Sequence, residues 1–214
     1  MLTIILCLLG LILLVLATDI LGKVGMVGPE LKRKIFHICS GTFIAFWPWL
    51  MSWTAIELLG LAMAAIVILN YRLKIFDFYK GIGRRSYGDL FMALGISLAA
   101  LTAPTKVVFA LALLNVSLAD SSAALIGKKY GKNWRYRIFS QEKSVIGTMT
   151  FWLVSLCVSA ICLIFARDQM QFSNYVELII IMPPILAALE NFSLLGLDNL
   201  TVPLAAIALV NLLT

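Results

Sequence analysis

The chain has 214 residues, of which 62% are hydrophobic and only 13% are charged, and its formal net charge is +6. A soluble domain is about half apolar and about a quarter charged, so this composition excludes a soluble protein and indicates an integral membrane protein. A helix needs about 20 residues to cross a bilayer, so the length leaves room for roughly seven to nine spans in a single membrane domain over residues 1–214.

Apolar runs separated by polar breaks predict an all-α, polytopic fold of about eight transmembrane helices. In chain order the runs cover residues 2–21, 34–50, 52–70, 89–103, 105–126, 145–166, 175–190 and 200–213. The first run has no basic residue before it, and Lys23 follows it, which is the reverse of the order in a cleavable signal peptide. We therefore predict that residues 2–21 form a retained anchor helix.

Basic residues alternate between the predicted loops. Of the 17 lysines and arginines, all but Lys106 and Arg167 fall around the loops after the first, third and fifth predicted helices. Positive charge marks the cytoplasmic loops of membrane proteins. The pattern therefore predicts that these loops are cytoplasmic and that the N-terminus lies on the other side. In a prokaryote the membrane would be the cytoplasmic (inner) membrane.

Polar side chains that this topology does not require gather on the same predicted face. They lie near helix ends, and they are Glu30, Arg33, Lys34, His37, Asp89, Asp120, Lys143, Ser144, Glu190, Asp198 and Asn199. The second, fourth, sixth and eighth predicted helices all begin at this face. A helix N-terminus presents free backbone N–H groups and binds anions. The sequence therefore predicts a site for phosphate groups at the cytoplasmic face.

Asp120 is the strongest single candidate in that site. It lies inside an apolar run, where an ionisable group costs a few kcal/mol and is by default functional. Ala119, Ala123 and Gly127 follow a spacing of four, which lets a neighbouring helix or a ligand approach the backbone closely. The alternative interpretation is that Asp120 pairs with a basic residue only to hold helices together.

The segment after Asp120, GKKYGKNWRYR at 127–137, combines two glycines with several basic residues. It is not a P-loop, because three residues rather than four separate its glycines. Its charge and glycine content nevertheless suit phosphate groups. Tyr130, Trp134 and Tyr136 could stack on a base or could serve as anchors at the membrane interface.

Five segments, taken in order, resemble the CTP-dependent polyprenol kinase family. This family includes phytol, farnesol and dolichol kinases and CTP-dependent diacylglycerol kinase, and it is related to the CDP-diacylglycerol synthases. The segments are RKIFHICSG (33–41), GDLFMALG (88–95), DSSAALIGKKYGK (120–132), KSVIGT (143–148) and LENFSLLGLDNLTVP (189–203). The resemblance implies a catalytic core over residues 30–203 or so, and a divalent cation, Mg²⁺, as cofactor. The implied reaction transfers the terminal phosphate of CTP to a lipid alcohol.

The resemblance also implies roles for individual residues. By position, Asp120, Lys143 and Asp198 would be catalytic, and Asp120 and Asp198 would hold the metal. The residues around the nucleotide and its phosphates would be Gly127, Lys128, Gly131, Lys132, Ser144 and Asn199. A second wall of the site would consist of Arg33, Lys34, His37 and Glu190. One position departs from the family pattern, because Ile146 stands where the family usually has glutamate.

Two other functions remain open. A cytidylyltransferase that makes a CDP-lipid would share the middle motif, but such enzymes carry a His-Gly-Gly and Asp-Arg pattern near the C-terminus, where this chain has Asp198 and Asn199. A non-enzymatic lipid or anion transporter would be expected to show repeats and broken helices that meet at the midplane. We therefore expect a kinase whose partners are the bilayer, a nucleoside triphosphate and a lipid alcohol (phytol, farnesol, dolichol-like or diacylglycerol), with no nucleic-acid partner.

Overall fold

The computed structural model describes residues 1–73, 86–139, 141–166 and 175–213. Its helices are α1 (Leu2–Lys23), α2 (Pro29–Ala45), α3 (Trp53–Leu73), α4 (Gly88–Thr102), α5 (Lys106–Leu114), α6 (Ser121–Tyr130), α7 (Val145–Ala166), α8 (Tyr175–Phe192) and α9 (Asp198–Leu213). A 3₁₀ turn, η1 (Trp47–Trp49), follows α2, and a π-helical turn, η2 (Asn115–Asp120), joins α5 to α6 in one rod. An antiparallel hairpin of β1 (Arg135–Ile138) and β2 (Gln141–Ser144) connects α6 to α7.

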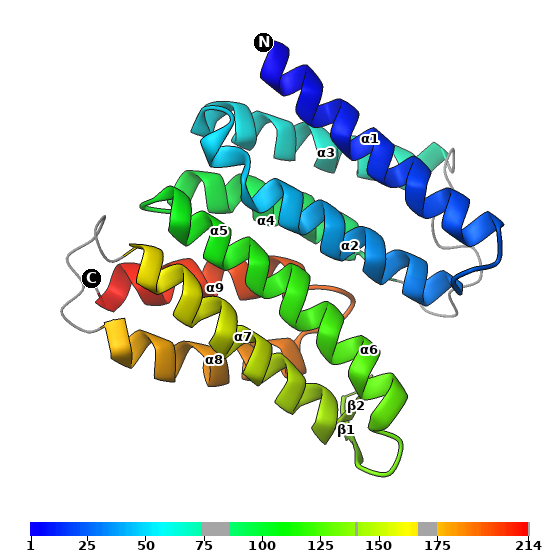
Figure 1. Cartoon of the computed structure of the whole chain (residues 1–214), viewed down its shortest axis with the longest axis vertical. Coiled ribbons are helices and arrows are strands. Elements are labelled where there is room, and N and C mark those ends of the chain that lie inside the picture. Colours follow the sequence, from blue (N-terminus) through cyan, green and yellow to red (C-terminus); the bar gives the residue numbers. More distant parts are fainter. Residues whose placement is uncertain (74–85, 140, 167–174, 214) are drawn as a thin grey trace.

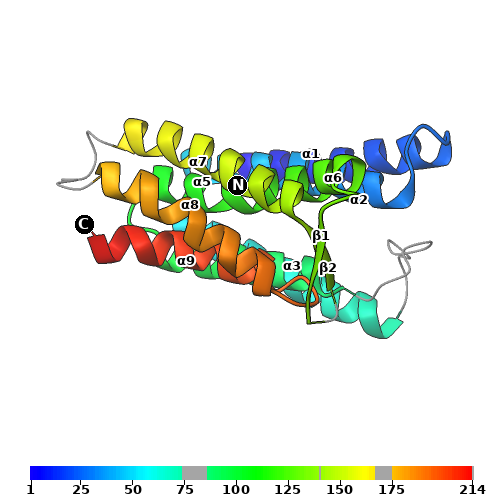
Figure 2. The ribbon, with the colours of Figure 1, turned by 90° about the horizontal axis from the view of Figure 1, so that it is seen from below.

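The helices pack in two layers (Figures 1 and 2). The first layer contains α1, α2, the α5–α6 rod and α7, whereas α3, α4 and α9 lie in the second. Helix α8 packs against both α7 and α9 and connects the two layers. Helix α5 lies at the centre, and every residue from Val107 to Leu113 is buried. The apolar core is therefore built around the first half of the rod, and the polar residues of the second half lie toward one end of the bundle.

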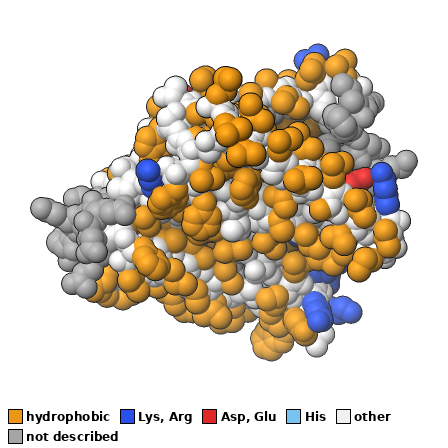
Figure 3. Space-filling model, turned by 45° about the horizontal axis from the view of Figure 1, so that its top comes forward, with side chains coloured by type: hydrophobic (Ala, Val, Ile, Leu, Met, Phe, Trp, Pro, Cys, Tyr) orange, Lys and Arg blue, Asp and Glu red, His pale blue; other side chains and the backbone are white. Residues whose placement is uncertain are grey.

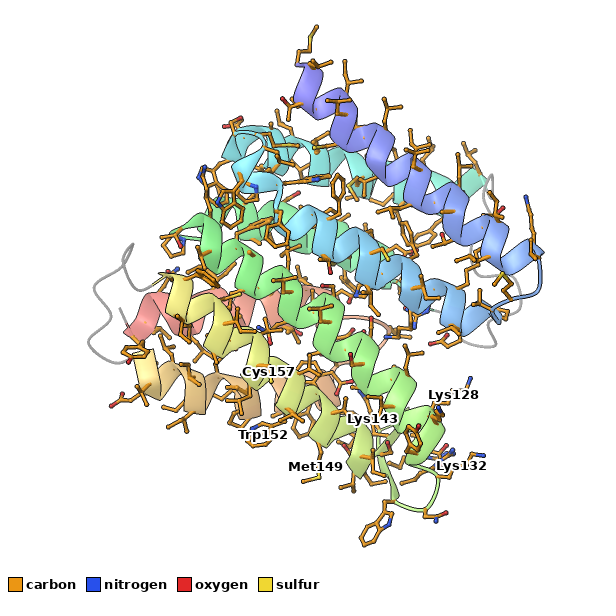
Figure 4. All side chains as sticks on the ribbon, viewed as in Figure 1. Lys128, Lys132, Lys143, Met149, Trp152 and Cys157 are labelled. Atoms are coloured by element: carbon orange, nitrogen blue, oxygen red, sulfur yellow. The ribbon has the colours of Figure 1, made fainter. Side chains whose placement is uncertain are left out.

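The outer surface of the bundle is apolar. The face shown in Figure 3 is covered mostly by hydrophobic side chains, with the few Lys and Arg side chains near its edges. On α7, Met149, Trp152 and Cys157 are exposed along the outer side of the helix (Figure 4). Such a surface is suited to contact with lipid chains, because burying apolar area away from water is favourable.

Five helical rods in the described part of the chain are long and apolar enough to cross a membrane, namely α1, α3, α5–α6, α7 and α8. Helices α4 and α9 are also apolar but have only 15 and 16 residues. At 1.5 Å per residue they reach about 22–24 Å, less than the roughly 30 Å of a hydrocarbon core. The structure supports a helical, multi-pass membrane protein. The number of spans and the side of the N-terminus stay predictions.

Each of the eight predicted ranges overlaps one helix or rod among the described residues. The range 145–166 matches α7 at both ends. The second apolar run, 34–50, is offset from α2, which begins at Pro29, the residue suited to a first helical position, and ends at Ala45. The prediction followed apolar content, whereas the first turns of α2 are charged and face a polar cavity. The fifth helix was ended too early at 126, because the rod continues to Tyr130.

The predicted basic loop at 127–137 is also corrected by the structure. Its first four residues are helical, and the rest leads through a turn into β1. The hairpin had no clear signal in the sequence, because the residues between its strands include neither glycine nor asparagine, which favour such turns. Phe139 instead takes the left-handed conformation there, with φ 52°. Its bulky side chain makes this conformation costly.

Candidate active site

A cavity of about 880 Å³ lies at the end of the bundle where α2, α7 and α9 begin and where α6 and α8 end. Its lining combines basic, acidic and small side chains from all of these elements. The lining residues are Pro29, Glu30, Arg33, Lys34, Ser86, Asp120, Ala123, Ala124, Gly127, Lys128, Arg135, Gln141, Glu142, Lys143, Ser144, Gly147, Thr148, Glu190, Ser193, Leu195, Gly196, Asp198 and Asn199. Three of the four helix N-termini predicted to converge, those of α2, α7 and α9, therefore lie at the cavity wall. The start of α4 at Gly88 is not part of the lining, although its carbonyl oxygen contacts Asn199.

Three carboxylates meet in this cavity. Asp120 ends the π-helical turn η2, Glu190 lies near the end of α8, and Asp198 is the first residue of α9. One oxygen from each carboxylate lies within 4.8 Å of the others. Asp120 and Glu190 are both buried, at 8% and 7% exposed. Glu190, which the sequence placed only in a second wall, thus belongs with the two predicted metal ligands.

Two lysines, the buried Lys34 and the partly buried Lys143, pair with these carboxylates. The Lys34 Nζ donates a hydrogen bond to the Asp120 Oδ2 at 2.6 Å, across 86 positions of sequence. The Lys143 Nζ donates to the Glu190 carboxylate and to the Glu190 carbonyl oxygen, the latter at 3.1 Å. Charges of this kind are buried only when they are paired. The cavity therefore holds an alternating arrangement of positive and negative groups contributed by η2, α2, β2, α8 and α9.

The π-helical turn η2 places Asp120 in the cavity wall. Wide π turns occur often at functional sites, where they redirect a side chain. His37 hydrogen-bonds to the backbone of Val116 inside this turn. Gly41 allows the close approach of α2, because a Cβ added there would lie 2.5 Å from the Ser117 Cβ. His37 thus contacts the turn that carries Asp120, and it does not line the cavity itself.

Three glycines surround the hydroxyl of Ser144 at the start of α7. An added Cβ would lie 2.7 Å from the Ser144 Oγ at Gly127, 2.4 Å at Gly131 and 3.0 Å at Gly147. The Ser144 Oγ also accepts a hydrogen bond from the Gly147 N–H at 3.0 Å. The end of α6 and the start of α7 therefore pack backbone to backbone here. This close packing explains why glycine occupies positions 127 and 131 of the basic segment.

Replacing Gly131 by alanine is expected to destabilise the protein. The new methyl group would lie 2.5 Å from the carbonyl oxygen of Gly127, which is helix backbone and cannot swing aside. Overpacking of this kind costs about 1–3 kcal/mol. We expect a lower thermal midpoint in detergent. Gly28→Ala is the matched control, because nothing lies within 4 Å of its added Cβ; equal midpoints for the two variants would contradict the packing account.

Most of the predicted site residues do line the cavity. They are Arg33, Lys34, Asp120, Gly127, Lys128, Lys143, Ser144, Glu190, Asp198 and Asn199. The exceptions are His37, Gly131 and Lys132. Lys132 is exposed and extends from the turn after α6, away from Lys143 (Figure 4). Ile146, in the first turn of α7, is also not part of the lining.

Asn199 lies on the α9 side of the cavity. Its Nδ2 donates to the carbonyl oxygen of Gly88 at 2.9 Å and so ties the start of α9 to the start of α4. The loop between α8 and α9 comes equally close, because a Cβ added at Gly196 would lie 2.6 Å from the Gly88 Cα. Gly196 also has a φ of +90°, which favours glycine. The Asn199 amide nitrogen therefore already has a structural partner.

One hydrogen-bonded group at the cavity was not predicted. The Tyr136 hydroxyl in β1 donates to the Asn191 Oδ1 at 2.7 Å and also hydrogen-bonds to the Thr148 hydroxyl. The Thr148 Oγ1 also lies 3.2 Å from the same Asn191 oxygen, so its single hydrogen can be donated either to that oxygen or to the Tyr136 hydroxyl. Neither base stacking nor anchoring in the interface, the two roles considered for Tyr136, accounts for this geometry. Thr148 and Asn191 fall inside the segments that carry the family resemblance, but their residue types alone gave no signal.

These features define a multi-helix membrane protein with a buried carboxylate–lysine site at one end of its bundle. The chain is 34% identical over 200 residues to the phytol kinase of Synechocystis sp., a match that covers 90% of this chain and 83% of the relative. The chain belongs to the polyprenol and phytol kinase family. No family model matches it, and no solved structure matches it.

Proposed function

We propose that the protein transfers the terminal phosphate of CTP to the hydroxyl group of a prenol-type lipid alcohol such as phytol, at the cytoplasmic face of the membrane. The observation that carries the proposal is the carboxylate–lysine site, in which Asp120, Glu190 and Asp198 meet and Lys34 and Lys143 pair with two of them. The similarity to a phytol kinase supports the class of acceptor. The choice of CTP as donor follows from the family resemblance of the five segments.

The three carboxylates fit a magnesium site. Mg²⁺ prefers carboxylate oxygens together with substrate phosphates and water. Asp120, Glu190 and Asp198 each offer one oxygen within 4.8 Å of the others, which is close to the span of an octahedral ligand shell. We propose that these residues hold Mg²⁺. When bound, the ion would neutralise charge on the phosphates.

The remaining charged groups of the cavity fit a polyphosphate. Lys128 adds positive charge to its wall, and Arg33 and Arg135, which pair with Glu30 and Glu142 of the same wall, offer further N–H donors. The N-termini of α2, α7 and α9 also lie at the cavity. Phosphoryl transfer needs positioned phosphates and neutralised charge more than it needs covalent help from the protein. In our proposal the chain therefore acts by holding the nucleotide in line with the acceptor hydroxyl.

The position of the cavity fits a lipid acceptor. It lies at the ends of helices whose outer surfaces are apolar, so a lipid lying against the bundle could present its hydroxyl group at the level of the helix ends. A water-soluble nucleotide could reach the same site from the aqueous side. Among the lining residues, Ala123, Ala124 and Gly147 leave room on the helical side of the cavity.

A panel of acceptors tests the proposal. Purified protein would be incubated with Mg²⁺, CTP labelled in its terminal phosphate, and phytol, farnesol, a dolichol or diacylglycerol in separate reactions. We expect labelled lipid with phytol or another prenol, and less label when unlabelled CTP rather than ATP or UTP is added as competitor. The absence of labelled lipid from every acceptor would contradict the proposed kinase activity.

A further inference from the structure

Three consecutive residues at the end of α8 hold the β1–β2 hairpin. Each contacts a different hairpin side chain, so that Glu190 pairs with Lys143, Asn191 accepts a hydrogen bond from Tyr136, and the ring of Phe192 lies against that of Phe139. The two rings are 6.4 Å apart between centroids, edge to face. The hairpin is thus attached to α8 along both of its strands, next to the carboxylate site.

The register of the hairpin links two of these contacts. Tyr136 in β1 and Lys143 in β2 are directly opposite each other. Opposite side chains in an antiparallel pair have Cβ atoms about 4.5–5.5 Å apart. Their partners, Asn191 and Glu190, are neighbours in sequence. The hydrogen bond from Tyr136 therefore lies beside the ion pair of Lys143 with a carboxylate of the proposed metal site.

The hairpin depends on outside contacts for its position. A two-stranded hairpin is at best marginally stable by itself in water. Arg135, Arg137, Phe139 and Glu142 are exposed, and the ion pair of Arg135 with Glu142 stays within the hairpin. The Tyr136 hydroxyl instead reaches both α7 and α8, through Thr148 and Asn191. Among the described residues, this hydroxyl group therefore connects the hairpin to α7 and to α8 at once.

We propose that Tyr136 and Asn191 are positioning residues, which hold the hairpin so that Lys143 stays beside Glu190 and faces the bound phosphates. The inference rests on the proposed function, since it assigns a purpose to the placement of Lys143. Loss of the Tyr136 hydroxyl leaves every charged group of the cavity present. It removes only the two hydrogen bonds, to Asn191 and Thr148, that fix the strand opposite Lys143.

Conservative variants test this inference. Tyr136→Phe and Asn191→Leu each remove one partner of the bond, and Tyr130→Phe is the matched control, because Tyr130 is exposed and does not line the cavity. A displacement of about 1 Å in a reacting assembly can cost up to about 10²-fold in rate. We expect Tyr136→Phe and Asn191→Leu to lower kcat/KM for CTP roughly tenfold, with the KM for phytol unchanged. The double variant should be no less active than Tyr136→Phe alone, since Tyr136→Phe already removes the bond between Tyr136 and Asn191.

Hydrogen–deuterium exchange gives a second measurement that does not depend on turnover. Tyr136→Phe should speed exchange in residues 135–144 while leaving the helices and the thermal midpoint near their wild-type values. Wild-type exchange in this segment would overturn the inference. Faster exchange with unchanged kcat/KM in an active enzyme would also overturn it, as would a general loss of stability that accounts for the lost activity. If the wild-type protein transfers no phosphate from CTP, the proposed function fails, and wild-type exchange in Tyr136→Phe would then reject the hairpin contact separately.

Discussion

Replacing Asp120 by asparagine is expected to lower turnover of CTP and a prenol by about 10³-fold, which is at the upper end of the effect of removing one charge-stabilising group from an active site. Asparagine has nearly the same shape but offers no negative charge to a metal ion. The neighbouring helices would keep their packing, because Ala119 and Ala123 are unchanged. Initial rates with labelled CTP over a range of Mg²⁺ concentrations would measure the effect. Asp19→Asn is the control, as Asp19 also pairs with a lysine, Lys32 at 2.6 Å, but does not line the cavity.

The same substitution also separates the catalytic role of Asp120 from a structural one. The Lys34 side chain is only 4% exposed and would lose its ion-pair partner, which costs about 3–5 kcal/mol for a buried pair. Asp120→Asn should therefore lower the thermal midpoint as well. Combining it with Lys34→Met removes the unpaired charge and should restore the midpoint without restoring turnover. If the double variant regained turnover, Asp120 would only hold the helices together.

Replacing Glu190 by glutamine is the second large effect that we expect. Glu190 is the carboxylate that the structure adds to the two metal ligands predicted from sequence, and it also pairs with Lys143. Glutamine retains one carbonyl oxygen but loses the charge, so turnover should fall by about 10²-fold. The Mg²⁺ concentration needed for half-maximal rate should rise. Rates measured across a magnesium titration would show both changes.

Glu177→Gln is the matched control for this variant. Glu177 lies in the first turn of the same helix α8, is exposed, and is separated from the cavity by most of the helix length. It should keep wild-type rates and the wild-type magnesium dependence. An unchanged magnesium dependence in Glu190→Gln would show that Glu190 does not hold the metal. The site would then retain only Asp120 and Asp198 as proposed ligands.

The general plan of the molecule could be predicted from hydropathy and charge. Apolar runs mark helices because a bilayer leaves the backbone no other partner than itself, and polar residues within them stand out against that background. Asp120 was recognisable for this reason. The convergence of Lys143 and Glu190 was also foreseen in outline, since the pattern of basic loops predicted that both residues lie at the same face of the bundle. Their direct pairing depends on side-chain positions that no pattern encodes.

The parts that could not be predicted are those set by tertiary contacts. The π-helical turn η2 has no characteristic residue pattern that a sequence could reveal. It is stabilised by neighbouring residues such as His37. The hairpin lacks a glycine or asparagine turn signal, and Phe139 takes a left-handed conformation that tertiary contacts must stabilise. Tyr136 had two reasonable roles in the sequence. Its hydrogen bond to Asn191 joins residues 55 positions apart, and only the fold brings them together.

The position of the transferred label tests the central claim most directly. Purified protein would receive phytol, Mg²⁺ and CTP labelled either in its terminal phosphate or in its innermost phosphate, in parallel reactions. The kinase account predicts label in the lipid from the terminal phosphate only, because the nucleotide leaves as CDP. Label in the lipid from the innermost phosphate would show transfer of a cytidylyl group instead. That result, or unlabelled lipid in both reactions, would contradict the account.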